Sequence, residues 1–207
     1  MNQVPKATAF KNPKLILLLF FLVIAGPFLF AWSMVQKAEK HEFRMSNHGD
    51  LITPPVNIAK TPLYNIGEKK TFLGESLNGK WVLVYASPAK CQQTCHDILY
   101  NMRQIRTALG KDANRLERLY LAHPKCDVSV CETYLGENYP DMPRANIALK
   151  DYDILFNQIS NSDARETVGE VYIIDPKGNI MMHYDADIEA KAILSDLKRL
   201  LRVSKIG

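Results

Sequence analysis

The sequence predicts an α/β fold, with a mixed central sheet flanked by helices, behind a single N-terminal transmembrane helix. Three observations support this prediction. Residues 15–35 contain no charged side chain, strand-like and helix-like runs alternate from residue 81 onward, and Cys91 and Cys95 lie where the first of these strands passes into a helix. Alternation of this kind is typical of α/β domains.

The apolar run is long enough to cross a bilayer, because a helix rises ~1.5 Å per residue. Gly26-Pro27 interrupts the run, which spanning helices tolerate, and Trp32 lies where an interfacial aromatic side chain is expected. A cleaved signal peptide is the alternative, but the run is too long and no small-x-small site follows it. We expect four segments: a short cytoplasmic tail (1–14), a transmembrane anchor (15–35), a stalk (36–47) and a folded domain (48–207).

Composition restricts the partners and the location. The net charge of +4 comes from 26 basic residues mixed among 22 acidic ones, so we expect no nucleic-acid partner. The chain outside the anchor is long enough for one hydrophobic core. The short N-terminus has no Arg-rich targeting segment. We expect a bacterial inner-membrane protein with a single pass, whose soluble domain faces the periplasm.

The folded domain begins its regular pattern with a strand, a helix and a second strand. Trp81–Ser87 is rich in β-branched and aromatic residues and is closed by Pro88, which indicates a buried strand and then a turn. Apolar residues then recur every three or four positions over roughly 92–109, the stripe of a core-facing helix. Leu116–Ala122 is the second strand of this βαβ unit.

The rest of the domain predicts a hairpin and a final helix. After a helical or irregular stretch to about residue 159, strands are expected over 171–184, with Gly178 and Asn179 where the turn needs positive φ. One apolar side of the last segment, 188 to about 203, indicates a helix packed on the sheet. The order β-α-β then β-β-α, behind a cysteine motif at a strand end, is that of the thioredoxin fold.

Cys91 and Cys95 are the predicted functional centre. At this spacing on a helix their Cα atoms lie roughly 6 Å apart, within reach of a disulfide that could open and close. Unpaired N–H groups and the dipole at a helix N-terminus favour a thiolate, and Lys90 adds a cation. The pair therefore indicates thiol exchange or soft-metal binding, and a small structural disulfide is the alternative.

Three segments carry a resemblance to a known family: 77–85 (LNGKWVLVY), the Cys91-x-x-x-Cys95 motif, and 172–178 (YIIDPKG). Together they resemble the Sco/SenC family of membrane-anchored, thioredoxin-like, copper-handling proteins, over roughly residues 48–203. The resemblance implies that Cys91 and Cys95 bind copper for delivery to cytochrome c oxidase subunit II. It also implies thiol–disulfide activity, with the membrane, that subunit or other oxidase assembly factors as partners.

The chain departs from this family at the third copper ligand. Where the family has a histidine, this sequence has residues 165–169, with Thr167 nearest to the expected position. Two thiolates can hold Cu(I), whereas Cu(II) also requires imidazole or harder ligands. His123, directly after the second strand, is the candidate replacement ligand. His96, next to Cys95 but one residue round the helix, is the weaker candidate, because its ring should point away from the cysteine stripe.

A second pair, Cys126 and Cys131, follows His123 in what we expect to be a loop. The interpretation we favour is a structural disulfide that staples this loop, because four cysteines then form two pairs. The alternatives are a relay that exchanges with Cys91 and Cys95, and a tetrathiolate zinc site.

The predicted function is that of a membrane-tethered Sco-like assembly factor for cytochrome c oxidase. It would act through Cys91 and Cys95 by thiol–disulfide exchange, by Cu(I) handling, or by both. In the enzymatic form, a thiol–disulfide oxidoreductase, Cys91 attacks a client disulfide and Cys95 resolves the intermediate. The alternative is a degenerate thioredoxin-like interaction protein whose cysteines are structural disulfides.

Overall fold

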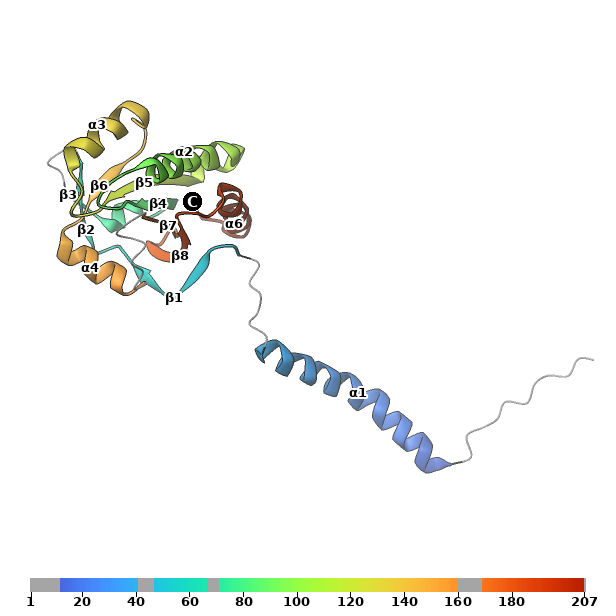
Figure 1. The fold of residues 1–207 in the computed structure, drawn as a ribbon. Coiled ribbons are helices and arrows are strands. Elements are labelled where there is room, and N and C mark those ends of the chain that lie inside the picture. Colours follow the sequence, from blue (N-terminus) through green and yellow to red (C-terminus); the bar gives the residue numbers. More distant parts are fainter. Residues whose placement is uncertain (1–11, 41–46, 67–70, 160–168, 207) are drawn as a thin grey trace, which may run out of the picture. The chain divides into compact units, whose positions relative to one another are not determined.

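The computed structural model describes residues 12–40, 47–66, 71–159 and 169–206, which fall into two compact units (Figure 1). The first unit contains the helix α1, Pro13–Lys40, with Pro27 inside it. Its segment Pro13–Met34 is long and apolar enough to cross a membrane. The helix therefore includes the predicted span and extends beyond both of its ends.

The second unit is built on one mixed sheet of eight strands in the order β1-β8-β7-β4-β5-β6-β2-β3. The central strand β4 runs parallel to β5 and antiparallel to β7. The strands are β1 (Asp50–Asn57), β2 (Pro62–Asn65), β3 (Thr71–Leu73), β4 (Trp81–Ala86), β5 (Leu116–Ala122), β6 (Arg144–Asn146), β7 (Glu170–Ile174) and β8 (Asn179–Asp185).

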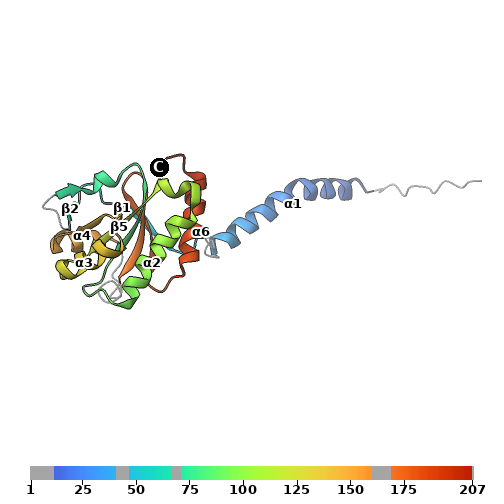
Figure 2. The ribbon, with the colours of Figure 1, turned by 90° about the horizontal axis from the view of Figure 1, so that it is seen from above.

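Helices cover both faces of this sheet. They are α2 (Gln93–Ala108), α3 (Val128–Asn138), α4 (Leu149–Asn157) and α6 (Ala190–Val203), with short 3-10 turns at Gly74–Leu77 and Gly110–Arg115. Helices α2 and α6 lie side by side over one face, and α4 lies over the other (Figure 1). Figure 2 shows the α2 and α6 face from a second direction. The sheet thus separates two cores, one under α2 and α6 and one under α4.

The predicted βαβ unit is confirmed. All six residues of β4 are buried, and the inward stripe of α2 contains Cys95, Ile98 and Met102. A central strand buried on both faces is expected to be apolar throughout rather than alternating. The thioredoxin-like fold class predicted from the order of elements is the fold observed.

Three details of the prediction were wrong. Cys131 is not in a loop, because α3 begins at Val128 after the N-cap Asp127, whose carboxylate accepts the Ser129 N–H at 3.1 Å. Gly178 has a positive φ of 82°, but Asn179 does not and instead donates to Asp175. The strands β1, β2, β3 and β6 were not predicted.

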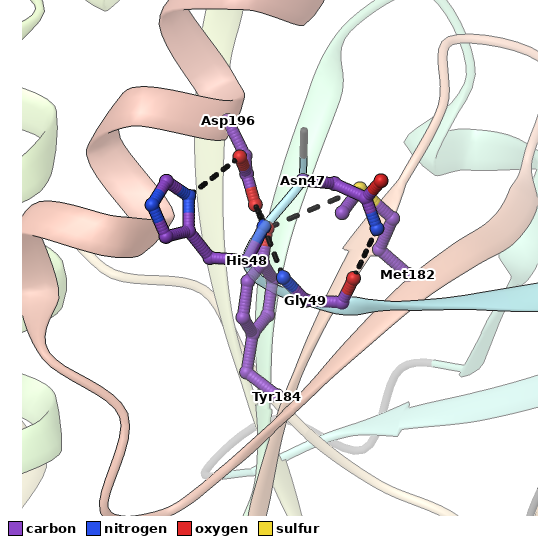
Figure 3. A network of polar contacts seen from close by, with 6 residues as sticks. All are labelled: Asn47, His48, Gly49, Met182, Tyr184 and Asp196. Atoms are coloured by element: carbon purple, nitrogen blue, oxygen red, sulfur yellow. Dashed lines mark hydrogen bonds and ion pairs between the residues drawn. The ribbon is translucent and has the colours of Figure 1, made fainter. Parts of the chain in front are cut away.

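A buried carboxylate joins the start of the domain to its last helix (Figure 3). Asp196 of α6 accepts hydrogen bonds from the N–H groups of His48 and Gly49, at 2.8 and 3.1 Å, and from the Tyr184 hydroxyl at 3.1 Å. The His48 ring Nδ1 lies 3.0 Å from the other oxygen. This network holds the chain in place where it enters β1.

Candidate thiol site

The cysteine pair lies where the central strand leaves the sheet. After β4, the N–H of Ser87 donates to the Leu121 carbonyl at 2.9 Å, and its hydroxyl accepts the N–H of His123 at 3.3 Å. These bonds tie the ends of β4 and β5 together. The loop that follows carries Cys91 and leads into α2, whose N-cap residue Gln92 makes no side-chain capping bond. The positive end of the α2 dipole is therefore directed at the cysteines.

Cys91 and Cys95 form a disulfide with their Cα atoms 5.3 Å apart. The two sulfurs differ in access. Cys95 is only 1% exposed and lies in the third position of α2, whereas Cys91 precedes the helix and is only partly buried. A partner from outside the molecule would meet Cys91 first.

A cavity of about 440 Å³ opens beside Cys91. It lies between the start of α2, the end of β5 and α3, and its lining is mainly apolar. The residues that matter for its chemistry are Lys90, Cys91, His96, Tyr120, Cys126 and Tyr134. Two cysteines from segments far apart in the sequence thus face one space.

The ring of His96 forms part of the wall of this cavity. It stacks on Tyr134 of α3, with the ring centroids 4.0 Å apart and the planes inclined by 14°. The sequence placed this ring away from the cysteine stripe, but the structure puts it in the same cavity as Cys91. The sequence analysis did not anticipate this position of His96, because the segment that supplies Tyr134 was expected only as a helical or irregular stretch after the loop with Cys126 and Cys131.

Two buried tyrosines have raised pKa values, and one of them, Tyr120, lines the cavity. Burial raises the pKa of Tyr120, and a hydrogen bond with Ser87 lowers it by a smaller amount. The Tyr85 ring lies edge-on to Tyr120 at 6.2 Å, and burial raises its pKa as well. Both phenols therefore remain protonated at neutral pH.

Cys126 is also in a disulfide, and it is 9% exposed. Its N–H donates to the His123 carbonyl at 2.8 Å, which fixes the turn before α3. The side chain of Cys131, its predicted partner, lies outside the described residues.

His123 is buried at the end of β5, with 2% of its surface exposed. Its Nδ1 accepts the N–H of Lys125 at 3.1 Å, and its ring meets Tyr152 edge-on at 4.9 Å. Tyr152 belongs to the core under α4, whereas Cys91 and Cys95 belong to the core under α2. The role of His123 as a ligand stays a prediction.

No ready-made metal cluster accompanies these residues. Within residues 12–40, 47–66, 71–159 and 169–206, no three or more His, Cys, Asp or Glu side chains are grouped to hold an ion. Thr167, nearest to the expected family ligand, lies outside those ranges. Once the disulfide is reduced, the thiolates of Cys91 and Cys95 would be two donors suited to a soft ion.

Comparison with known proteins places this architecture in a family. A family model described as a transmembrane-like, thioredoxin-like, C-terminal domain matches residues 81–204, from the central strand through the last helix. The chain belongs to this family. The comparison with curated proteins found no match.

Solved structures with the same fold include copper-bound Sco proteins. Yeast Sco1 with copper bound is 16% identical, with a TM-score of 0.59 over 73% of this chain and 91% of that chain. Arabidopsis thaliana ScoI with copper bound is 14% identical, with a TM-score of 0.56 over 71% and 99%. BsSco, a Sco-family cytochrome c oxidase assembly protein with a disulfide switch, is 17% identical, with a TM-score of 0.52 over 73% and 96%. The likeness confirms the predicted resemblance to the Sco family at the level of the fold.

Proposed function

We propose that this chain is a membrane-tethered, Sco-like assembly factor for cytochrome c oxidase that acts through Cys91 and Cys95. One observation carries the proposal. A disulfide at the end of the central strand has one sulfur beside a cavity and the other buried at a helix N-terminus. The fold around it is shared with Sco proteins solved with copper bound.

The reduced pair is arranged for thiol–disulfide exchange. The Cys91 thiolate attacks one sulfur of a client disulfide, which expels the other client sulfur as a thiolate and leaves a mixed disulfide. The Cys95 thiolate then attacks Cys91, restores the Cys91–Cys95 bond and releases the second client thiolate. The client gains the two electrons that the pair loses. Because Cys95 is buried, it is suited to resolve the intermediate rather than to attack the client.

The same reduced pair can carry Cu(I) as cargo. Cu(I) is soft and accepts low coordination, so two thiolates are a sufficient donor set. Cu(II) needs an added nitrogen ligand, for which His96 lines the cavity beside Cys91 and His123 is the candidate from the sequence. Exchange requires the two sulfurs to be free as well, so copper loading and client reduction compete for one reduced state.

The tether would determine where this chemistry takes place. The apolar segment of α1 supports a single-pass anchor, and we place the domain on the periplasmic side of a bacterial inner membrane. There the thiols would act on membrane clients, with oxidase subunit II or other oxidase assembly factors as partners.

A copper titration of the full chain in detergent tests the proposal. The reduced protein is titrated anaerobically with Cu(I) against a chromophoric chelator, beside a variant with Cys91→Ser and Cys95→Ser. We expect wild type to bind one equivalent more than the double variant, which still contains Cys126 and Cys131, while Thr94→Ser, a control between the two cysteines, binds like wild type. Equal binding by wild type and the double variant would remove the copper role.

A redox measurement tests the exchange reaction separately. The potential of the Cys91/Cys95 pair is obtained by equilibration with glutathione buffers and alkylation. A value below about −300 mV would mark an inert structural bridge and would favour the degenerate interaction protein.

A further inference from the structure

We propose that the cavity beside Cys91 is an internal disulfide relay, in which the Cys91/Cys95 pair exchanges with the disulfide that contains Cys126. The inference rests on the proposed thiol chemistry of Cys91 and Cys95. It adds a second, intramolecular substrate to that chemistry.

One cysteine of each disulfide faces the same cavity. Cys91 and Cys126 line the same cavity of about 440 Å³, and Cys91 packs against the core cluster to which Cys126 belongs. Each lies in an irregular segment, Cys91 between β4 and α2 and Cys126 between β5 and α3. The exchange would therefore require these irregular segments to move, and not the strands of the sheet.

Access favours an internal partner for Cys126. With 9% of its surface exposed, Cys126 is poorly accessible to a folded client protein. The cavity nevertheless provides an approach from the side of Cys91. Cys95 is 1% exposed and is not among the residues that line this space. Cys91 is therefore the sulfur positioned to exchange with both its own partner and Cys126.

One wall of the cavity carries a charge that favours a thiolate. Lys90 supplies a positive charge beside Cys91, while the stacked rings of His96 and Tyr134 and the phenol of Tyr120 form other parts of the lining. Asp127 also lines the cavity, but its carboxylate is engaged as the N-cap of α3, where it accepts from the N–H and the hydroxyl of Ser129. A negative sulfur formed here would lie near the Lys90 cation and near a carboxylate that already accepts hydrogen bonds.

The exchange begins once an external dithiol has reduced the Cys91–Cys95 disulfide, and from that point it balances without an added oxidant. The Cys91 thiolate attacks Cys126 Sγ, forms a Cys91–Cys126 bond and expels the former partner of Cys126, Cys131 in the predicted pairing, as a thiolate. The Cys95 thiolate then attacks Cys91 Sγ, forms the Cys91–Cys95 bond and expels the Cys126 thiolate. Two electrons pass from the first pair to the second, and the expelled thiolates take protons from solvent. The reverse sequence returns the electrons to Cys91 and Cys95.

A trapping experiment tests the central intermediate. The full chain with Cys95→Ser and Cys131→Ser retains only Cys91 and Cys126 and is oxidised in a glutathione buffer in detergent. We expect mass spectrometry of unreduced peptides to find an intramolecular Cys91–Cys126 disulfide in most molecules. The matched control with Cys91→Ser and Cys131→Ser retains Cys95 and Cys126 and should cross-link at least tenfold more slowly. Equal rates, or no Cys91–Cys126 bond, would overturn the relay.

A second measurement uses the wild-type protein, so it tests the relay even if the variants do not fold. Wild type receives one equivalent of a dithiol reductant, and free thiols are alkylated at increasing times and located by mass spectrometry. Label should appear first on Cys91 and Cys95 and later on Cys126, whereas the Cys91→Ser variant should leave Cys126 oxidised. Label on Cys91 and Cys95 that never reaches Cys126 would refute the relay and leave the proposed function standing. Failure to reduce Cys91 and Cys95 at all would count against both.

Discussion

Asp196 and His48, 148 positions apart in the chain, make two contacts: a 2.8 Å hydrogen bond from the His48 backbone N–H and a 3.0 Å contact to its ring Nδ1 (Figure 3). Asp196 is 3% exposed and lies on the inward side of α6 between Ile193 and Leu197. A buried carboxylate is tolerated only when several donors satisfy it. Its donors come from the segment that enters β1 and from β8, so the carboxylate has a structural role.

Asp196→Asn should lower the free energy of unfolding by about 2–3 kcal/mol, because the amide leaves buried donors partly unsatisfied. Urea unfolding followed by the fluorescence of the buried Trp81 measures the change. Asp187→Asn, at an exposed position shortly before α6, is the matched control and should stay within about 0.5 kcal/mol of wild type. Equal stability of the two variants would contradict this account of the network.

Alkaline pH should destabilise the domain through Tyr184. Burial first, and then the charge and hydrogen bond of Asp196, raise the pKa of Tyr184 above its usual value of 10.0. The folded state thus holds the proton more tightly than the unfolded chain. The resulting stabilisation is complete below about pH 10 and is lost as the pH rises above it.

The Tyr184→Phe variant isolates this contribution. Above pH 10 its free energy of unfolding should fall less steeply than that of wild type, by up to about 1.4 kcal/mol per pH unit. Urea unfolding at pH 8, 10 and 11 gives both slopes. Identical slopes would show that Tyr184 titrates alike in the folded and unfolded states.

Gly169 and Gly79 offer a matched test of close packing. Both have positive φ, 78° and 93°, but a Cβ at Gly169 would lie 2.6 Å from the Ala86 carbonyl, whereas nothing lies within 4 Å of one at Gly79. Gly79→Ala should cost about 1–2 kcal/mol of stability from backbone conformation alone. Gly169→Ala should cost at least about 3 kcal/mol, since overpacking adds to the same strain. Thermal unfolding measures the loss of stability in each variant. Similar losses would mean that the end of β4 shifts at little cost to accommodate the added methyl group.

Copper binding should distinguish the two histidines near the site. His96 shares the cavity with Cys91, so His96→Ala should weaken Cu(II) binding by the reduced protein about tenfold or more. His123→Ala removes a buried ring and its hydrogen bond, so it should lower stability by about 2 kcal/mol. Anaerobic Cu(II) titrations of the two folded variants measure the affinities. A loss confined to His123→Ala would establish His123 as the ligand instead.

The sequence predicted the elements whose patterns are local and strong. Trp81–Ala86 is apolar throughout and α2 has a clear apolar stripe, so both were found with their neighbours. The edge strand β1 contains Pro54 and Pro55, and exposed residues dominate it, so it lacks the alternation that indicates a strand. The short β6 is recognisable only from its pairing with β5 and β2.

Only the part of the candidate site that is local in sequence was predicted. Cys91 and Cys95 are close in sequence, and a helical start after a strand was enough to pair them. Cys126 and His96 lie in the same cavity as Cys91 because of how α3 packs against α2. No periodicity along either segment specifies that packing. Asp127 was the one available signal, because an aspartate that caps a helix indicates that α3 begins there.

The pairing of β1 with β8 also affects the order in which the domain can fold during synthesis. Strand β1 leaves the ribosome early. Its partner β8, and the Asp196 that binds the segment before β1, are synthesised near the end of the chain. Contacts so distant in sequence form late, because long loops must close first. Cys91 and Cys95 are only four residues apart, so their disulfide can form before any long loop has closed. The nascent chain can therefore meet an oxidant with its thiol pair complete and its first strand still unpaired.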